Sequence, residues 1–346
     1  MSERALLIHS ELATYCQGFT KAWEAWPPLP LPEPPELAWW DTVLSSTGKG
    51  ELQGQPLLNA LETALPQLRL PQREGISRSD LYKALVLRGE PLDAASIAAI
   101  GPPPHWQHPE AIRLWIAPHP CGRIPVLQTP SGSDFVQLVR ALAHRGEPIQ
   151  LAEGVHAQAV TGLIHWGLIH QFGHHSRARL IVLHEAPYGS VPASAVPGGL
   201  NEGQWLSAST TLRLEHELTH LATKRLLGEM RLNLLDELIA DCMGMVAALG
   251  WFNADLFGRC LGIDAGRGRW ITYTAALSEK QAQQALNLVM IRARELERIL
   301  IEQPQLLQPE QALARLQWLC QQRLDQPIRL LAQADVELMT YGEQQP

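Results

Sequence analysis

The sequence predicts an α+β fold in which helices dominate the second half of the chain. Short apolar runs typical of strands alternate with helical patterns over residues 113–184. Two consecutive helices are then expected to begin at Asn201 and Asn233, because each asparagine is a good N-cap before a periodic apolar pattern. Strong helix formers over residues 278–301 extend the helical part towards the C-terminal end.

Length and composition are those of a globular protein. The chain has 346 residues, of which 46% are hydrophobic and 18% are charged, and this is enough for two or three modules with substantial cores. A formal net charge of −7 argues against a nucleic-acid-binding surface. We therefore expect no nucleic-acid partner.

Regular elements are sparse near the start of the chain and denser after residue 110. The stretch from Trp26 to Pro35 contains too many prolines for a helix and is expected to be an extended loop. Pro125 indicates that the strand containing it lies at a sheet edge. The expected strands are residues 113–117, 124–127 and 179–184, and the expected helices before residue 177 are residues 55–65, 79–88, 93–100, 133–144 and 155–169.

Glycines in the second half of the chain mark helix ends and loops. Gly228 is a good residue to end the helix that begins at Asn201. Four glycines between residues 258 and 268 predict a flexible connection. Helices are expected beyond it over residues 278–301, 309–323 and 328–339.

The central motif is His216-Glu217-Leu218-Thr219-His220, an H-E-x-x-H pattern inside the first of the two capped helices. Residues four apart lie about one turn apart on the same helical face, so His216 and His220 can direct two imidazoles at one point. Glu217 can reach a water bound at that point. Two neutral nitrogen ligands, an open position and a general base are what a hydrolytic zinc site requires.

The second helix offers a third ligand. Glu237 and Asp241 repeat the four-residue step of the histidines, so two antiparallel helices can present the two pairs face to face. Glu237 would ligate the metal beside His220, and Asp241 would orient one histidine ring from behind. Asp236, three residues after Asn233, is expected to complete an acidic variant of the capping box.

This pattern, H-E-x-x-H followed by Glu237-x-x-x-Asp241, resembles the zinc site of the gluzincin metallopeptidases. The resemblance covers residues 216–241 and implies a Zn²⁺ cofactor, with His216, His220 and Glu237 as the metal ligands. It also implies Glu217 as the base and Asp241 as a support for a ligand histidine. In enzymes of this type, a strand just before the zinc helix holds extended peptide substrates.

A larger part of the chain is similar to a bacterial protein family that is uncharacterised. This similarity includes Arg123 to Leu127, Asp134 to His144 and the H-E-x-x-H site itself, and it indicates no substrate. Combined with the zincin-like helix pair, the patterns predict four segments: a loosely organised Pro-rich N-terminal segment (1–75), a mixed α/β module (76–176), a zincin-like metal-binding core (177–262) and a helical C-terminal segment (263–346).

A hydrolase of this type also needs a hydrogen-bond donor for the oxyanion that develops during the reaction. Glu217, as the base, cannot supply it, and no histidine follows the H-E-x-x-H motif. Tyr188 and Tyr273 are therefore the candidate catalytic donors. His184 or an arginine such as Arg269 is the alternative.

Cysteine use favours a reducing, cytoplasmic setting. The five cysteines are few and widely spaced, and no two form a C-x-x-C pair. Residues 1–18 lack the basic start and apolar run of a secretory signal. The longest apolar stretch, residues 238–252, is too short to span a bilayer, so no membrane association is expected.

These patterns together predict a zinc-dependent hydrolase, and more narrowly an intracellular metallopeptidase acting on a peptide or protein substrate. The alternative is a catalytically silent, metal-bound regulatory or partner-binding protein with a zincin fold. That alternative predicts a fourth coordination position blocked by a cysteine or carboxylate from residues 258–270. A third interpretation is a helix pair that binds no metal.

Overall fold

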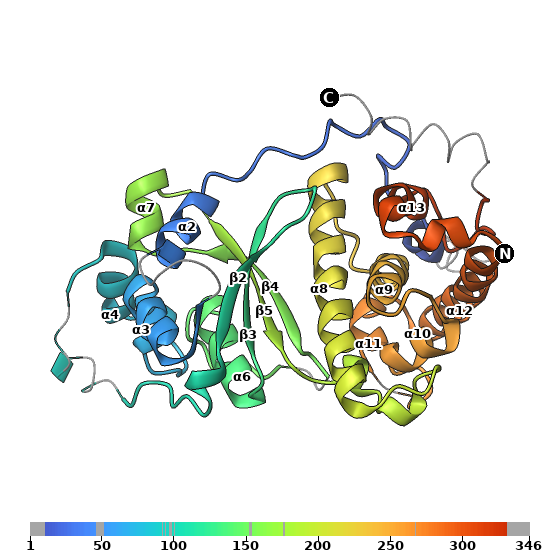
Figure 1. Cartoon of the computed structure of the whole chain (residues 1–346). Coiled ribbons are helices and arrows are strands. Elements are labelled where there is room, and N and C mark those ends of the chain that lie inside the picture. Colours follow the sequence, from blue (N-terminus) through green and yellow to red (C-terminus); the bar gives the residue numbers. More distant parts are fainter. Residues whose placement is uncertain are drawn as a thin grey trace. The chain divides into compact units, whose positions relative to one another are not determined.

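The computed structural model describes residues 11–45, 52–91, 93, 95–96, 99, 101–151, 154–175, 177–266 and 268–330. The chain divides into two compact units (Figure 1). We call residues 28–186 the sheet unit, and residues 1–27 together with 187–346 the helical unit. In sequence, the sheet unit is thus inserted between the first segment of the helical unit and the rest of it. Both units contain helices and the sheet unit contains the strands, which confirms the predicted α+β class.

This division differs from the four predicted segments. The Pro-rich N-terminal segment is shared between the units, because the helical unit includes the chain up to Pro27 and the sheet unit starts at Pro28. The predicted boundary between residues 176 and 177 also cuts a strand, residues 178–184, away from the sheet to which it belongs. Local composition does not reveal which distant segments pack together, and packing decides the boundaries.

The sheet unit is built on a mixed sheet with the strand order β1-β2-β3-β5-β4. The strands β3 and β5 are parallel, whereas the other neighbouring pairs are antiparallel. Because β5 is hydrogen-bonded on both sides, no edge of it is open to an extended substrate. The bounds are β1 (Leu52–Gln53), β2 (Arg113–Ala117), β3 (Ile124–Thr129), β4 (Ala157–Leu163) and β5 (Ala178–His184).

Pro125 lies in β3, which is a central strand, so the predicted edge position is wrong. The strand β3 pairs with β2 from Ile124 to Gln128, but its pairing with β5 begins only at Val126. On the β5 side, Pro125 therefore precedes the ladder. A residue without an N–H can be accommodated at such a strand start.

The helix predicted over residues 155–169 is also wrong. This region forms β4 and then the helix α7 (Trp166–Phe172), which is capped by His165. The strand β4 pairs with β5 and contributes Val160 and Leu163 to the core. Pairing with a strand and burial in the core outweigh a weak helical pattern.

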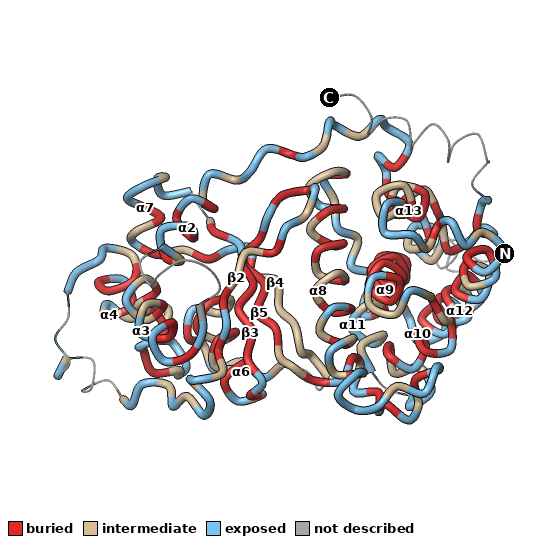
Figure 2. The backbone as a smooth tube through the Cα atoms, in the orientation of Figure 1, coloured by how far each residue is buried: buried red, intermediate tan, exposed pale blue. Residues whose placement is uncertain are grey.

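The core of the sheet unit lies between the sheet and the helices α2, α3 and α6 (Figure 2). Each helix contributes a large buried side chain: Trp40, Leu58 and Phe135. The helices expected over residues 55–65, 79–88 and 133–144 are confirmed, α2 is an addition, and residues 93–100 lie partly outside the described residues. The helical bounds are α2 (Leu37–Ser45), α3 (Gly54–Ala64), α4 (Asp80–Tyr82) with a π-helical turn (Lys83–Arg88), α6 (Gly132–Leu142) and short turns at Pro66–Arg69, Ile76–Arg78 and Pro109–Ala111.

The helical unit contains the two capped helices that the sequence predicts. Asn201 and Gln204 form a capping box at the start of α8, and Gly228 ends it in the left-handed conformation. In the described ranges, no helix is long and apolar enough to cross a membrane. The bounds are α8 (Glu202–Leu227), α9 (Leu234–Leu249), α10 (Ala254–Leu261), α11 (Trp270–Tyr273), α12 (Glu279–Glu302), α13 (Ala312–Cys320) and short turns at Tyr188–Ser190, Ala193–Ala195, Pro304–Leu307 and Pro309–Gln311.

The helix α9 forms the centre of the helical unit. Every residue from Leu234 to Val246 is buried, because α8, α12 and α13 pack around it (Figure 2). Residues 254–261 form α10, capped by Asn253, so the first part of the stretch predicted to be a flexible connection is helical instead. The predicted helix over residues 309–323 is confirmed in its central part as α13, whereas most of residues 328–339 lies outside the described residues.

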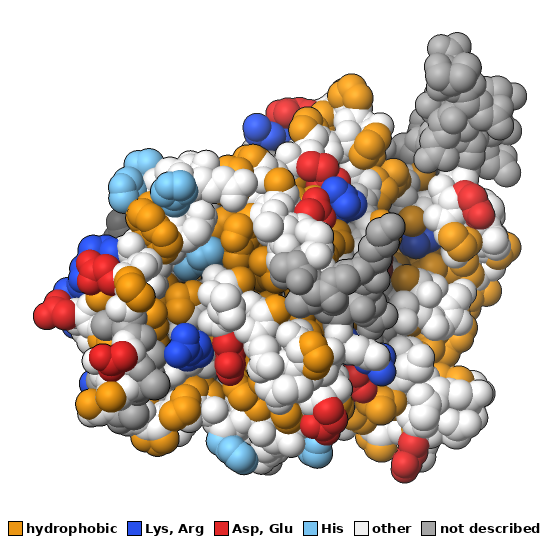
Figure 3. Space-filling model, turned by 60° about the vertical axis from the view of Figure 1, so that its left-hand side comes forward, with side chains coloured by type: hydrophobic (Ala, Val, Ile, Leu, Met, Phe, Trp, Pro, Cys, Tyr) orange, Lys and Arg blue, Asp and Glu red, His pale blue; other side chains and the backbone are white. Residues whose placement is uncertain are grey.

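Surface charge is mixed in sign. On the face drawn in Figure 3, acidic and basic side chains lie in small groups separated by hydrophobic and uncharged side chains. Some acids and bases are paired, for example Arg323 with Asp325 at 2.7 Å. Exposed pairs of this kind contribute little to stability.

Close contact between α8 and α9 depends on Gly244. A Cβ atom at this position would lie 2.6 Å from the carbonyl oxygen of Leu212, which is backbone and cannot move aside cheaply. Gly244 lies one turn after Asp241, and Leu212 lies one turn before His216. This glycine therefore lets the two helices approach each other beside the predicted metal ligands.

We expect Gly244→Ala to lower the stability of the protein by about 1–3 kcal/mol, because the methyl group forces the two helices apart. The measurement is urea unfolding followed by circular dichroism. Gly203→Ala on α8 is the matched control, since its Cβ would meet nothing closer than 3.5 Å. Equal stability of the two variants would contradict the role of Gly244.

Candidate metal centre

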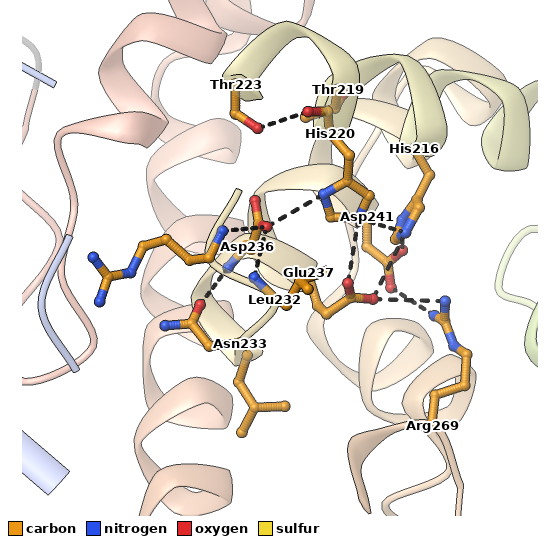
Figure 4. A network of polar contacts seen from close by, with 12 residues as sticks. His216, Thr219, His220, Thr223, Leu232, Asn233, Asp236, Glu237, Asp241 and Arg269 are labelled. Carbon is orange, nitrogen blue, oxygen red and sulfur yellow. Dashed lines mark hydrogen bonds and ion pairs between the residues drawn. The ribbon is translucent and has the colours of Figure 1, made fainter. Parts of the chain in front are cut away.

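The three predicted metal ligands lie together in the helical unit (Figure 4). His216 and His220 are one turn apart on α8, and Glu237 is in the first turn of α9. The two Nε2 atoms are 3.1 Å apart. Glu237 places Oε1 3.2 Å from Nε2 of His220 and Oε2 3.6 Å from Nε2 of His216.

These spacings match those of ligands around one small cation. Ligand atoms about 2.0–2.1 Å from a tetrahedral zinc ion lie roughly 3.3 Å from one another. All three side chains are buried, with exposed fractions of 4% for His216, 8% for His220 and 1% for Glu237. Within the described part of the chain, the group contains no fourth His, Cys, Asp or Glu side chain.

The centre also carries an excess of negative charge. Asp236, Glu237 and Asp241 are buried, and Arg269 lies 3.7 Å from Glu237 and 3.3 Å from Asp241. Three carboxylates and one guanidinium leave a formal charge of two minus, which a divalent ion bound by neutral imidazoles would balance. Oε2 of Glu237 is buried without a hydrogen bond. Donor type, spacing and charge thus all fit zinc.

Asp241 holds His216 from behind. Its Oδ1 lies 2.7 Å from Nδ1 of the ring, which indicates that Nδ1 carries the proton and Nε2 presents its lone pair. Burial alone would raise the pKa of Asp241, but Arg269 and His216 outweigh burial and lower it. The sequence prediction that Asp241 supports a ligand histidine agrees with this geometry.

Tyr188 lies at the Nδ1 side of His216, away from Glu237, and this position does not fit its predicted role as an oxyanion donor. Its hydroxyl donates to Asp241 and lies 3.0 Å from Nδ1 of His216, on the side of the ring away from Glu237. Arg269 donates to the same hydroxyl at 3.2 Å. Burial raises the pKa of Tyr188 well above its ordinary value. Tyr188 therefore helps to hold Asp241 and His216, because its short turn is packed against α8 and α10.

Tyr273 lies close to Glu237 and to Glu217. Burial raises the pKa of Tyr273, and the nearby carboxylates of Glu237 and Glu217 raise it further. Glu217 is half-buried on α8 beside His216. The two residues thus lie within electrostatic range of one another, and Tyr273 lies within range of Glu237, a predicted metal ligand.

The neighbouring carboxylates strongly affect the pKa of His220. Burial lowers its pKa, but Asp236 and Glu237 outweigh burial and raise that pKa well above the ordinary value. The physical meaning is that this pocket of carboxylates attracts positive charge, whether as a proton or as a metal ion.

Comparison with known proteins identifies the protein family of this chain. A family model described as "Family of unknown function (DUF7005)" matches residues 5–178 and 173–328. The chain belongs to DUF7005. Neither the curated proteins nor the solved structures contain a significant match to it. The family assignment covers both units of this DUF7005 protein and carries no activity with it.

Two residues make more contacts in the centre than the sequence predicts. Arg269 was expected only as an alternative oxyanion donor, yet it contacts Glu237, Asp241 and Tyr188. Asp236 was expected only as a helix cap. For Arg269 the sequence contains no spacing signal, since it reaches the centre from the position just before α11, a separate short helix. His184, the other alternative donor, lies in the sheet unit and packs against His156 and Phe135.

We expect Asp241→Asn to weaken zinc binding by about 10- to 100-fold, because His216 loses the anionic partner that orients its ring. The measurement is a zinc dissociation constant from competition with a fluorescent chelator. Asp255→Asn, at an exposed position in the first turn of α10, is the matched control and should bind zinc like the wild type. Unchanged affinity in Asp241→Asn would contradict the assignment.

Proposed function

We propose that this DUF7005 protein is a zinc-dependent hydrolase, and more narrowly an intracellular metallopeptidase that cleaves peptide or related amide bonds. The observation that carries the proposal is the group formed by His216, His220 and Glu237, whose ligand atoms lie 3.1–3.6 Å apart. Structural zinc sites use four protein ligands, whereas catalytic sites use three and keep one position open. A three-ligand group in the described part of the chain therefore favours a catalytic site.

The donor set supports zinc over magnesium and calcium. Imidazole nitrogens with one carboxylate suit zinc, whereas magnesium and calcium prefer oxygen ligands throughout. A zinc ion bound there would supply a Lewis acid that acidifies a water and polarises the carbonyl of the scissile bond.

Glu217 has the position and the freedom that a general base needs. Its carboxylate interacts electrostatically with Tyr273 and Arg213, and it takes part in no hydrogen bond with the other described residues. In the proposed reaction it accepts a proton from the attacking water and delivers that proton to the leaving nitrogen. The need to protonate a nitrogen leaving group is what links this carboxylate to amide substrates.

Tyr273 is the proposed oxyanion donor. Its raised pKa keeps the phenol protonated, so the O–H remains available to donate a hydrogen bond where negative charge develops. Tyr188 has no part in this step because its proton is donated to Asp241.

The cytoplasmic part of the proposal rests on the cysteines. All five are buried thiols. Burial raises the pKa of Cys16 to about 11 and that of Cys242 to about 12, so these thiols stay protonated and unreactive. Thiols without disulfide links are what a protein of a reducing compartment contains.

We expect Glu217→Gln to retain zinc and to lose peptide hydrolysis by roughly 100- to 10,000-fold, because the base is removed while the three ligands remain. The substrate probe is a library of randomised decapeptides whose products are read by mass spectrometry. Zinc content is measured on the same samples by elemental analysis.

Glu202→Gln, an exposed change in the first turn of the same helix, is the control for Glu217→Gln. Equal hydrolysis by the wild type and Glu217→Gln would rule out the base. A wild-type protein that holds zinc in a one-to-one ratio and cleaves none of the peptides would favour the alternative, a catalytically silent metal-bound protein.

We expect Tyr273→Phe to lower kcat by about 100- to 1,000-fold while zinc content stays unchanged, because one donor to the oxyanion is lost. Tyr82→Phe, at a buried tyrosine of the sheet unit, is the matched control. Steady-state kinetics on a peptide found in the library separates kcat from KM. A change confined to KM would assign Tyr273 to substrate binding instead.

A further inference from the structure

Asp236 and His220 are neighbours, and each has one buried polar atom without a hydrogen-bond partner. Nδ1 of His220 lies 3.4 Å from Oδ2 of Asp236, at an orientation that makes no hydrogen bond. Oδ1 of Asp236 is also buried without a hydrogen bond, and the whole residue is 0% exposed. A buried imidazole N–H and a buried carboxylate oxygen are costly when unpaired, and the 3.4 Å contact between Nδ1 and Oδ2 places the ring N–H beside this carboxylate.

Asp236 is held by the loop between the two helices. Its Oδ2 accepts the N–H groups of Arg231 and Leu232, both at 3.1 Å (Figure 4). Leu232 has a φ of 51°, a left-handed conformation that costs energy for any residue with a side chain. Its side chain is largely exposed and supplies little packing. The hydrogen bonds to Asp236 therefore stabilise a loop conformation that would otherwise be unfavourable.

The N-terminal segment, residues 14–20, holds the same loop from outside. Arg231 donates to the carbonyl oxygen of Gly18 at 2.9 Å and to that of Thr14 at 3.3 Å. Asn233 donates to the carbonyl oxygen of Tyr15 at 3.0 Å. A continuous path of hydrogen bonds thus links residues 14–18 to the carboxylate that faces His220.

The hydroxyl of Tyr15 joins two elements of the centre. It accepts the N–H of Leu234, the first residue of α9, at 3.0 Å, and it donates to the carbonyl oxygen of Tyr273 at 3.2 Å. The start of α9 carries Asp236 and Glu237, and α11 carries Tyr273. Tyr15, more than two hundred residues away in sequence, therefore fixes both elements in relation to each other.

We propose that Asp236 is a positioning residue that orients His220 for metal binding, and that the N-terminal segment keeps Asp236 and the start of α9 in place through Tyr15 and Arg231. Each ligand imidazole then has its own carboxylate, Asp241 for His216 and Asp236 for His220. This inference rests on the proposed metal site and goes beyond it, because it makes metal affinity depend on residues 14–18.

A helix cap would need only an oxygen acceptor at position 236. Asn supplies that acceptor and preserves the two bonds to the loop, but it lacks the negative charge that raises the basicity of a ligand imidazole. Asp236→Asn therefore separates the two roles. We expect it to bind zinc about 10- to 100-fold more weakly than the wild type, with the melting temperature of the zinc-free protein unchanged.

The second variant is Tyr15→Phe, which alters no atom of the centre. We expect about two- to tenfold weaker zinc binding, because the metal must then order the start of α9. Tyr82→Phe is the control and should bind zinc like the wild type. Zinc dissociation constants come from chelator competition on the full chain, and melting temperatures come from zinc-free samples.

Each outcome decides the inference. Weaker zinc binding by Asp236→Asn with an unchanged zinc-free melting temperature supports it, whereas equal zinc binding overturns it and leaves the three-ligand site intact. If Asp236→Asn does not fold, Tyr15→Phe decides: weaker binding supports the inference and equal binding overturns it. A wild-type protein that binds no zinc overturns both this inference and the proposed function.

Discussion

Burial of carboxylates against imidazoles is the constraint on which the helical unit depends. Asp236, Glu237 and Asp241 are at most 1% exposed, and uncompensated charges at such positions are costly. Arg269 neutralises one of them, and the Nε2 atoms of His216 and His220 lie 3.1 Å apart. A polar cluster of this kind destabilises a fold unless a positive charge occupies its centre. A cation bound at the proposed site would therefore also stabilise the packing of α8 against α9.

The geometry of the helix pair follows from a few backbone features. The left-handed Gly228 ends α8, and Asn233 starts α9 after a short loop, so the two helices run in opposite directions. Gly244 brings α9 close to the backbone of α8 at Leu212. This contact fixes the position of one helix against the other. Because the two acids on α9 and the two histidines on α8 are each four residues apart, the two pairs then face each other.

Local signals predicted the parts of the structure that depend on local physics. Capping and periodicity located α8 and α9, and the H-E-x-x-H and E-x-x-x-D spacings pointed to three side chains that the fold brings together. Features that depend on distant pairing were missed, such as β4, which forms because β5 is available to pair with it. The position of Tyr188 was missed for the same reason, since nothing near it in sequence shows that its hydroxyl meets Asp241. Arg269 and Tyr15 likewise act through contacts between segments far apart in the chain.

Four carboxylates lie near the histidines, and they differ in the hydrogen bonds that restrain them. This difference suggests that they have different roles. Asp236 is held by backbone N–H groups of the loop, and Asp241 by Tyr188, Arg269 and His216. Such restraint suits groups that orient a ring. Glu237 has one oxygen without a hydrogen bond inside the group of ligand atoms, as a metal ligand requires. Glu217 is half-buried and forms no hydrogen bond within the described residues. A proton carrier must be able to change partners during a reaction, and of the four acids Glu217 has the environment that permits it.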